Sequence, residues 1–444
     1  MEEHENPKIA VIGGYGGMGK FFAELFAKQG FQVIIAGPNE VAGKDVAKKI
    51  KAEYAKNNVQ AVSHADVVMI SVPINATAGV IKEVAPRMRK GSVLMDVTSV
   101  KEEPCRLMDE YAPRGVEVIG THPIFSHRVG SLEGQVFVLT PVRGDKWLAW
   151  FRGFLARNKA RLFETTPEEH DHVMAVVQGL THYTYIAVGK TLDKLDFDIK
   201  ESRKFASPVY ELMLDMIGRV IGQNPALYAE IQMSNPEIPA IHDIFLETAR
   251  ELSDAVKEKD EKRFVEMMKQ AARNFDDLER AMGRSDKAIK SLIAELDFLK
   301  SSVGKEICLR HIYSGKTHIG VVKSVNPETV VLEEGGKSSE LKISNLQVLG
   351  DEERIECKKE FYGIVERDYS AVFDESVDEP FIVALLKGFD ENIAEVSVKD
   401  VYRGKKIGEG KKSVCFKTCI IDSEIKKTEK RIGEFFKGIG GSLR

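Results

Sequence analysis

The sequence predicts an α/β protein that opens with a doubly wound parallel sheet and continues into an all-helical domain, a small β-barrel and an α+β domain. Residues 9–12 form a continuous apolar run, which is typical of a parallel strand buried on both faces. A glycine-rich turn, an amphipathic helix and a second apolar strand follow. From about residue 166, successive helices replace the alternation of strands and helices. We therefore expect domains at residues 1–165, 166–300, 301–350 and 351–444.

Composition excludes several classes of protein. The chain has 444 residues and a formal net charge of −4, so no overall basic charge points to nucleic acid. No apolar run approaches the roughly 18 residues that a membrane-spanning helix needs. The five cysteines include no CxxC pair and no neighbouring histidine cluster. We expect a soluble, cytoplasmic protein with reduced thiols, no metal site and no membrane contact.

The turn after residue 12 carries the pattern GxGxxG at Gly14, Gly16 and Gly19. In such a turn the first glycine permits a tight bend, the second lets the backbone approach a pyrophosphate, and the third lets the helix pack on the strand. The helix that follows ends at Gly30, and its free N-terminal amides favour phosphate. A lone GxGxxG is weak evidence, but within a strand–turn–helix–strand unit it predicts a Rossmann-type dinucleotide site.

Cofactor preference depends on the end of the second strand, where folds that bind NAD place an acid against the ribose 2′-hydroxyl. Here Gly37 stands at that position. The missing carboxylate removes repulsion against a 2′-phosphate, for which Asn39 and Lys44 are candidate partners. The sequence therefore favours NADP over NAD, with Glu40 as the acid that would favour NAD instead.

Polar residues follow three further predicted strands, at the sheet edge where doubly wound folds bind ligands. The strand at residues 66–72 leads to Asn75, and the strand at residues 92–97 leads to Ser99 and Lys101. The strand at residues 116–120 delivers His122, whose ring suits a general base near neutral pH. The alternative for Ser99 and Lys101 is a surface turn, and for His122 a hydrogen-bonded structural histidine.

The helical region places two polar residues in apolar surroundings. Residues 168–192 predict one long, largely apolar and buried helix, in which His182 is either a satisfied core histidine or a functional one. Arg219 lies on an apolar helix face, where an unpaired guanidinium is costly, so it should meet an acid from the protein or from a substrate. Residues 241–300 continue as charged amphipathic helices, as expected of a dimerising domain.

The ordered motifs GGxGxMG, SVPI, DVTSVK, THP, QGLTH and SPVYELMLDMIGRVIGQNPALYAEI resemble the prephenate dehydrogenase family over residues 8–300. The resemblance implies oxidative decarboxylation of prephenate to 4-hydroxyphenylpyruvate in tyrosine biosynthesis, with NAD or NADP, by a homodimer. It assigns His122, Ser99, Lys101 and His182 to catalysis and Arg219 to a substrate carboxylate. The cofactor residues that we expect from the glycine turn and the following strand ends are Gly14, Gly16, Gly17, Met18, Gly19, Asn39, Pro73 and Asn75.

The residue types suit this reaction. The substrate hydroxyl must lose a proton, which His122 can accept, and the dianionic substrate needs the opposing charges of Arg219 and Lys101. His182 would hold a substrate carboxylate or orient the pocket. The family usually has a glycine soon after its HPMF-like stretch, whereas this chain has Ser126, so the choice between prephenate and arogenate stays open. The alternatives are an arogenate dehydrogenase, another NADP-dependent oxidoreductase such as an NADP:deazaflavin reductase, and an RNA-binding regulator built on a retired enzyme.

Two small modules follow the helical region. Residues 302–349 alternate apolar and polar side chains in short runs separated by turns, which predicts a five-stranded barrel resembling Sm-like or SH3-like barrels. Residues 353–444 predict the order βαββαβ, a ferredoxin-like layout that resembles the anticodon-binding domain of phenylalanyl-tRNA synthetase β chains. The basic residues in this module suggest RNA, although a solvated face or an aromatic amino-acid effector site is the alternative. They are Arg403, Lys405, Lys406, Lys411 and Lys412.

Overall fold

The computed structural model describes residues 6–404, 406–423 and 425–443. The chain divides into two compact units, residues 1–278 and 279–444. The first unit contains an eight-stranded sheet and a set of helices, and the second contains two small sheets with their own helices. No helix in the described ranges is both long enough and apolar enough to cross a bilayer.

The sheet of the first unit has the strand order β3-β2-β1-β4-β5-β6-β7-β8. Neighbouring strands are parallel except for β6 and β7, which are antiparallel. The sheet therefore has the 3-2-1-4-5-6 order of a doubly wound dinucleotide fold, extended by two strands. The strands are β1 (Lys8–Ile12), β2 (Gln32–Ala36), β3 (Glu53–Ala55), β4 (Val67–Ile70), β5 (Val93–Asp96), β6 (Glu117–Pro123), β7 (Val136–Arg143) and β8 (Arg161–Glu164).

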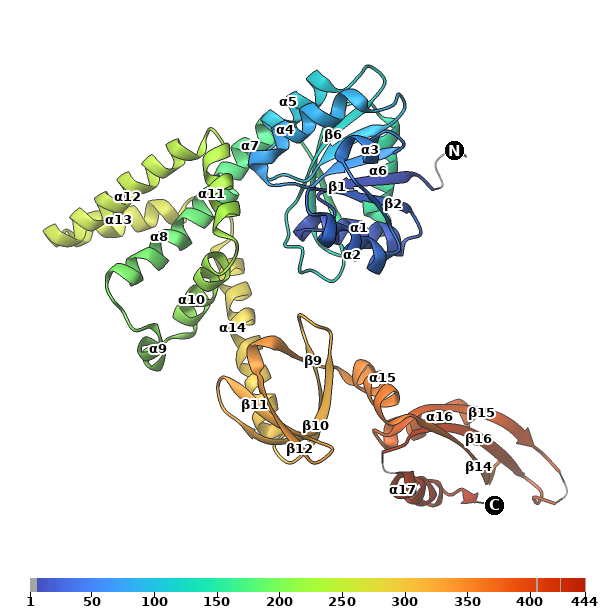
Figure 1. The fold of residues 1–444 in the computed structure, drawn as a ribbon. Coiled ribbons are helices and arrows are strands. Elements are labelled where there is room, and N and C mark those ends of the chain that lie inside the picture. The colour runs from blue at the N-terminus through green and yellow to red at the C-terminus, as the bar shows by residue number, and fades with distance from the viewer. Residues whose placement is uncertain (1–5, 405, 424, 444) are drawn as a thin grey trace. The chain divides into compact units, whose positions relative to one another are not determined.

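Helices cover both faces of this sheet (Figure 1). They are α1 (Gly17–Lys28), α2 (Glu40–Ile50), α3 (Asn58–Val62), α4 (Ile74–Val84), α5 (Glu102–Tyr111) and α6 (Lys146–Arg157). One buried cluster joins the sheet to α1, α2 and α6 and includes Phe22, Val46 and Phe151. A second cluster joins the opposite face to α3, α4 and α5 and includes Ile81 and Leu107. The central strands are buried on both sides, as their continuous apolar sequences predict.

The rest of the first unit is helical. The elements are α7 (Pro167–Met174), a π-helical turn (Ala175–Leu180), α8 (Thr181–Lys194), α9 (Ile199–Ser202), α10 (Pro208–Ile221), α11 (Pro225–Ser234), α12 (Ile238–Glu258) and α13 (Glu261–Ala272). The single buried helix expected at residues 168–192 is thus interrupted by the π-helical turn, and α8 has no buried residue. The apolar composition of residues 168–192 did not distinguish a helix buried in the core from one whose apolar side chains stay exposed in a single chain.

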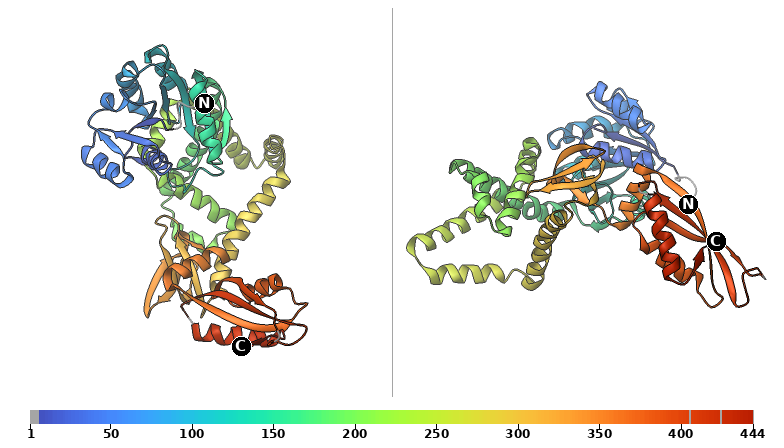
Figure 2. Two further views of the ribbon diagram at one scale, coloured as in Figure 1. Left: turned by 90° about the vertical axis from the view of Figure 1, so that its right-hand side faces the viewer. Right: turned by 90° about the horizontal axis from the view of Figure 1, so that it is seen from below.

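The boundary between the units falls at the first residue of the long helix α14 (Leu278–Ser301), the rest of which belongs to the second unit. A five-stranded antiparallel sheet follows in the order β12-β11-β10-β9-β13, which confirms the five strands predicted there. The strands are β9 (Glu306–His311), β10 (Thr317–Val325), β11 (Thr329–Glu334), β12 (Lys337–Lys342) and β13 (Leu346–Val348). Leu299, from the last turn of α14, packs into the core of this sheet. Figure 2 shows the end of this helix, in yellow, beside the orange strands.

The C-terminal module has the predicted βαββαβ order and the sheet order β15-β16-β14-β17. Its elements are α15 (Asp351–Tyr362), β14 (Ile364–Asp374), α16 (Glu379–Phe389), β15 (Ile393–Tyr402), β16 (Lys411–Ile421), α17 (Ile425–Gly438) and β17 (Ser442–Leu443). Helix α15 is tied to the preceding sheet through Glu306, which accepts from Tyr362 Oη at 2.6 Å and pairs with the buried Lys358 at 2.7 Å.

Candidate active site

The glycine turn between β1 and α1 leaves room for a ligand at one position. A Cβ added at Gly14 would lie 2.6 Å from Ile35 Cγ2, and one at Gly19 would lie 2.4 Å from the Gly13 carbonyl oxygen. Gly16, at the N-cap of α1, has its nearest such atom 4.0 Å away. Packing therefore requires Gly14 and Gly19, whereas Gly16 leaves an open cradle beside the α1 amides. This cradle fits the pyrophosphate of a dinucleotide.

Two tyrosine side chains that we did not predict from the sequence, Tyr15 and Tyr54, lie at the end of β2. Tyr15 Oη accepts from the Asn39 amide at 3.1 Å, and Tyr54 Oη donates to the Gly37 carbonyl at 3.1 Å. The Asn39 side chain caps α2 by accepting from the Ala42 amide. Glu40 pairs with Lys44 at 2.6 Å on the surface. The acid and the base considered for the cofactor ribose thus neutralise each other in this structure.

The turn after β4 is linked to the helical region. Pro73 occupies the N-cap of α4, and the exposed Asn75 lies in its first turn. The Ile74 amide donates to Glu230 Oε2 of α11 at 2.8 Å. Because a free helix N-terminus attracts negative charge, Glu230 fixes α11 against the loop that carries Pro73 and Asn75.

Lys101 does not occupy the place expected for a substrate-binding cation. Its side chain is fully buried, and its ammonium group pairs with Asp96. It also donates to the Thr121 carbonyl at 2.8 Å and to Thr98 Oγ1 at 3.2 Å. All three ammonium donors are therefore used inside the protein, and we correct the expectation that Lys101 opposes the substrate charge. Its contacts with Asp96 and Thr121 link the ends of β5 and β6, next to Ser99 and His122.

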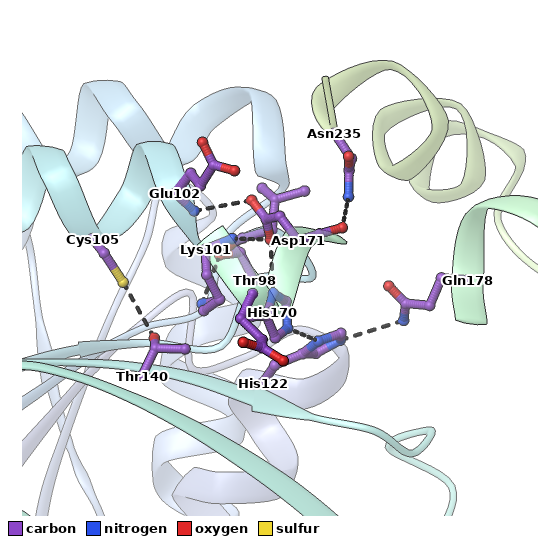
Figure 3. A network of polar contacts seen from close by, with 12 residues as sticks. Thr98, Lys101, Glu102, Cys105, His122, Thr140, His170, Asp171, Gln178 and Asn235 are labelled. Atoms are coloured by element: carbon purple, nitrogen blue, oxygen red, sulfur yellow. Dashed lines mark hydrogen bonds and ion pairs between the residues drawn. The ribbon is translucent and has the colours of Figure 1, made fainter. Parts of the chain in front are cut away.

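His122 lies within β6, which continues to Pro123 rather than ending at residue 120, and its side chain is 3% exposed. Its Nδ1 is 2.8 Å from His170 Nε2, and His170 Nδ1 is 2.7 Å from Asp171 Oδ1. Asp171 also accepts from the backbone amides of Lys101 at 2.8 Å and Glu102 at 3.0 Å. Figure 3 shows this chain of contacts, with Gln178 approaching His122 from the other side.

The contacts assign the proton positions on both rings. The Asp171 carboxylate only accepts, so His170 carries its proton on Nδ1 and offers the lone pair of Nε2. His122 then donates from Nδ1, which leaves its Nε2 without a proton. Burial, followed by the charges of His170 and Lys101, lowers the pKa of His122 well below its ordinary value. His122 is therefore a neutral ring whose Nε2 can accept a proton.

Gln178, which contacts His122, and His182 each carry a polar atom that lacks a partner among the described residues. Gln178 Nε2 lies 3.4 Å from His122 Nε2, while Gln178 Oε1 is buried without a hydrogen bond. His182 Nδ1, one helical turn further on, is also buried and unbonded. The His182 ring packs edge-on against Tyr228, with 4.6 Å between centroids, and burial lowers its pKa. Since buried polar groups normally have partners, these two atoms mark where a ligand would bind.

Arg219 does not lie in an apolar environment. It is exposed on α10, whose buried residues are Leu214, Ile217 and Val220, and no salt bridge joins it to an acid within the described ranges. Its charge is close enough to Tyr228 to oppose the rise that burial causes in the pKa of that phenol. The expectation that the Arg219 guanidinium is buried is therefore wrong. Its desolvation cost cannot be used to argue that the enzyme site is intact.

Sequence reasoning missed His170, Asp171, Gln178 and Glu230. A usable signal was present, because His170, Gln178 and His182 recur at multiples of four residues and helical spacing of this kind places side chains on one face. The π-helical turn at Ala175–Leu180 lies between them, and such turns are frequent at functional sites. No group of His, Cys, Asp or Glu in the described part of the chain is arranged to hold a metal ion.

The basic residues of the C-terminal module do not form the expected open cluster. Lys412 is buried, pairs with Glu379 at 2.9 Å and donates to the Val377 carbonyl at 2.5 Å. Arg403 pairs with Glu375 at 2.7 Å, and Lys405 lies outside the described residues. Lys406 and Lys411 are exposed. Acidic neighbours thus neutralise Arg403 and Lys412, two of the five basic residues that suggested an RNA-binding surface.

Comparison with known proteins identifies the family. The prephenate dehydrogenase nucleotide-binding domain matches residues 22–164, and the prephenate dehydrogenase dimerization domain matches residues 166–270. A probable arogenate/prephenate dehydrogenase of Methanocaldococcus jannaschii is 42% identical over 447 residues, covering 100% of this chain and 99% of the relative. The chain belongs to the prephenate and arogenate dehydrogenase family. The T-protein of Haemophilus influenzae is 32% identical over 58% of this chain and 64% of its own length.

The dehydrogenase fold is also found among solved structures. A prephenate dehydrogenase from Aquifex aeolicus, in complex with hydroxyphenyl propionate and NAD+, superposes with a TM-score of 0.51 at 21% identity. The match covers 61% of this chain and 98% of that one. The ferredoxin-fold anticodon binding domain matches residues 362–444, which confirms the resemblance of the C-terminal module.

Proposed function

We propose that this dehydrogenase oxidatively decarboxylates prephenate to 4-hydroxyphenylpyruvate, with arogenate as the alternative substrate of the same site. The observation that carries the proposal is the buried chain of contacts from His122 through His170 to Asp171, which leaves Nε2 of His122 directed away from these partners. A bound nicotinamide supplies the hydride acceptor. The substrate loses the hydride from its carbinol carbon and the hydroxyl proton to His122. The bond to the ring carboxylate then breaks, and its electron pair completes the aromatic ring as carbon dioxide leaves. The ring oxygen, now a phenolate, takes the proton back from His122.

The surrounding residues divide between holding His122 and holding the substrate. His170 and Asp171 orient the His122 ring so that its Nε2 faces the site, in the manner of a base and the groups that position it. Gln178 and His182 offer their unbonded atoms to substrate oxygens. Ser99, half-buried after β5, would contact the reacting hydroxyl. Arg219 would pair with a substrate carboxylate, because its guanidinium is exposed and unbridged among the described residues.

We further propose that NADP is accepted at least as well as NAD. Gly14, Gly16, Gly17, Met18 and Gly19 would hold the pyrophosphate, and Pro73 and Asn75 would flank the nicotinamide half. The support for NADP is local: β2 ends without an acid, and the N-terminus of α2 opens at Asn39. A helix N-terminus attracts a 2′-phosphate, and Glu40 is drawn toward Lys44 instead.

The active form is proposed to be a homodimer built through the helical domain. Large apolar side chains are exposed along this region, among them Phe205, Met233, Ile244 and Met268. A monomeric protein rarely leaves so much apolar surface in contact with water. The match to a dimerization domain covers the same residues.

The proposal is tested by following reduced nicotinamide with each pairing of prephenate or arogenate with NAD or NADP. Turnover of prephenate with NADP is expected. Turnover of arogenate alone would move the assignment to the alternative substrate, and turnover of neither would refute the proposal.

A further inference from the structure

Tyr15 stands between Gly14 and Gly16 of the glycine turn, and its side chain reaches the end of β2. A Cβ added at Gly37 would lie 2.4 Å from Tyr15 Cε1, so the ring covers the backbone from which an acidic side chain would project. The Tyr15 hydroxyl oxygen is 3.1 Å from the amide of Asn39, the N-cap of α2. Folds that bind NAD place a carboxylate here, against the ribose 2′-hydroxyl. In this chain a phenol covers that position.

The hydrogen bonds at the end of β2 leave the Tyr15 hydroxyl with a proton to donate. A tyrosine hydroxyl has one proton and can also accept. Tyr15 Oη accepts from the Asn39 amide, and none of the described residues accepts the Tyr15 proton. Tyr54 differs, because its Oη donates to the Gly37 carbonyl at 3.1 Å. Tyr54 therefore holds the end of β2, whereas Tyr15 presents a donor there.

The charges around this donor suit an anion. Helix α2 begins directly after Asn39, and a helix N-terminus attracts phosphate. Lys44, one turn into the helix, is exposed and pairs with Glu40 at 2.6 Å. An exposed ion pair contributes little to stability, so Lys44 can exchange Glu40 for a phosphate that carries nearly two negative charges.

We propose that Tyr15 is a specificity-determining residue of the cofactor site, and that its hydroxyl donates to the 2′-phosphate of NADP. This inference rests on the dinucleotide site and the NADP preference of the proposed function. A phenol is uncharged at neutral pH, so it does not repel the phosphate as a carboxylate would. NAD has a neutral hydroxyl at the same carbon and gains less from the donor, because hydrogen bonds to charged groups are the stronger ones.

The first test measures the dissociation constants of NADP and NAD for the full-length chain by titration calorimetry, without substrate. Tyr15→Phe keeps the ring and removes only the hydroxyl. We expect the constant for NADP to rise about tenfold or more and the constant for NAD to rise less than about threefold. Tyr54→Phe is the matched control, because it removes a hydroxyl from the same end of β2 whose proton is already donated to Gly37. It should change both constants by the same factor.

The ratio of the two constants decides the outcome. A Tyr15→Phe variant that keeps the parent ratio would overturn the inference, because the hydroxyl would then not distinguish the 2′-phosphate. An equal change of the ratio in Tyr54→Phe would also overturn it, since the effect would come from the shape of the β2 end. The ratio in the parent tests the proposed NADP preference, and its change in Tyr15→Phe tests the role of Tyr15, so the two failures are distinguishable.

Phosphorus NMR of bound NADP gives a second readout that depends neither on affinity nor on turnover. At saturating NADP, the resonance of the bound 2′-phosphate should move between the parent and Tyr15→Phe and should keep its position in Tyr54→Phe. An unchanged resonance in Tyr15→Phe would contradict a direct contact between the Tyr15 hydroxyl and the 2′-phosphate.

Discussion

His122 Nδ1 lies 2.8 Å from His170 Nε2, and this contact determines which nitrogen of His122 faces the candidate site. Asp171 fixes the proton of His170 on Nδ1, and His170 in turn fixes the proton of His122 on Nδ1. The free Nε2 of His122 thus depends on two residues that precede the π-helical turn. The base belongs to the sheet, whereas its orientation comes from the first helix of the helical domain.

Replacing His122 with Asn should lower kcat by about 10²- to 10⁴-fold, because the side chain keeps a hydrogen-bonding group but cannot accept the proton. Steady-state turnover measures the change, and a thermal melt shows whether the variant is folded. A folded His122→Asn enzyme that turns over at the parent rate would assign the base to another residue.

Replacing His170 with Asn tests the positioning role of that residue. Loss of orientation should cost about 100-fold in kcat/KM. Since His170 contributes to lowering the pKa of His122, its removal should also move the acid limb of kcat/KM to higher pH. His172→Asn is the matched control, because His172 is exposed on the same helix and pairs with Glu237. If His170 had a purely structural role, His170→Asn would lower the melting temperature and leave the acid limb of kcat/KM in place.

The parent enzyme should keep its activity at mildly acidic pH, because the lowered pKa of His122 keeps that ring neutral, but its stability should decrease there. Burial lowers the pKa values of His122, His170 and His182, so their protonation disfavours the folded chain. The free energy of unfolding should be highest above the unfolded histidine pKa of about 6.5 and should fall as the pH drops below it. Urea unfolding at a series of pH values measures this slope. Stability that increases below pH 6.5 would contradict the neutral buried rings.

Replacing Arg219 with Ala should raise KM roughly 10- to 100-fold with a smaller effect on kcat, because a carboxylate contact is similar in the ground and transition states. Arg203→Ala is the comparison, since Arg203 is exposed nearby but already pairs with Glu211 and Asp215. Equal KM values for the two variants would remove Arg219 from the substrate site.

The end of β2 can be tested with paired substitutions. Gly37→Asp should lower kcat/KM for NADP relative to NAD by roughly tenfold through repulsion of the 2′-phosphate. A Cβ at residue 37 would lie 2.4 Å from the Tyr15 ring, so Gly37→Ala serves as the control for crowding alone. If both variants change the cofactor ratio equally, charge does not set the preference.

The sequence predicted those parts of the fold that local patterns specify. The glycine turn, the buried strands and the βαββαβ module depend on short periodicities and on turn residues, and the structure confirms them. Long-range pairing was not visible in this way. Lys101 follows a strand end, as many ligand-binding residues do, but its charge is matched by Asp96 five residues earlier. Arg219 was likewise assigned to an apolar face of α10. Glu211, Asp215 and Arg219 recur every four residues and form a polar side of this helix, separate from its buried residues.

The central claim is that one site couples hydride removal to loss of the ring carboxylate. The most direct measurement compares reduced nicotinamide formed with carbon dioxide released when prephenate labelled in the ring carboxylate is the substrate. The account predicts one carbon dioxide for each nicotinamide reduced, and 4-hydroxyphenylpyruvate as the product. Nicotinamide reduction without release of carbon dioxide, or no reaction with either prephenate or arogenate, would contradict it.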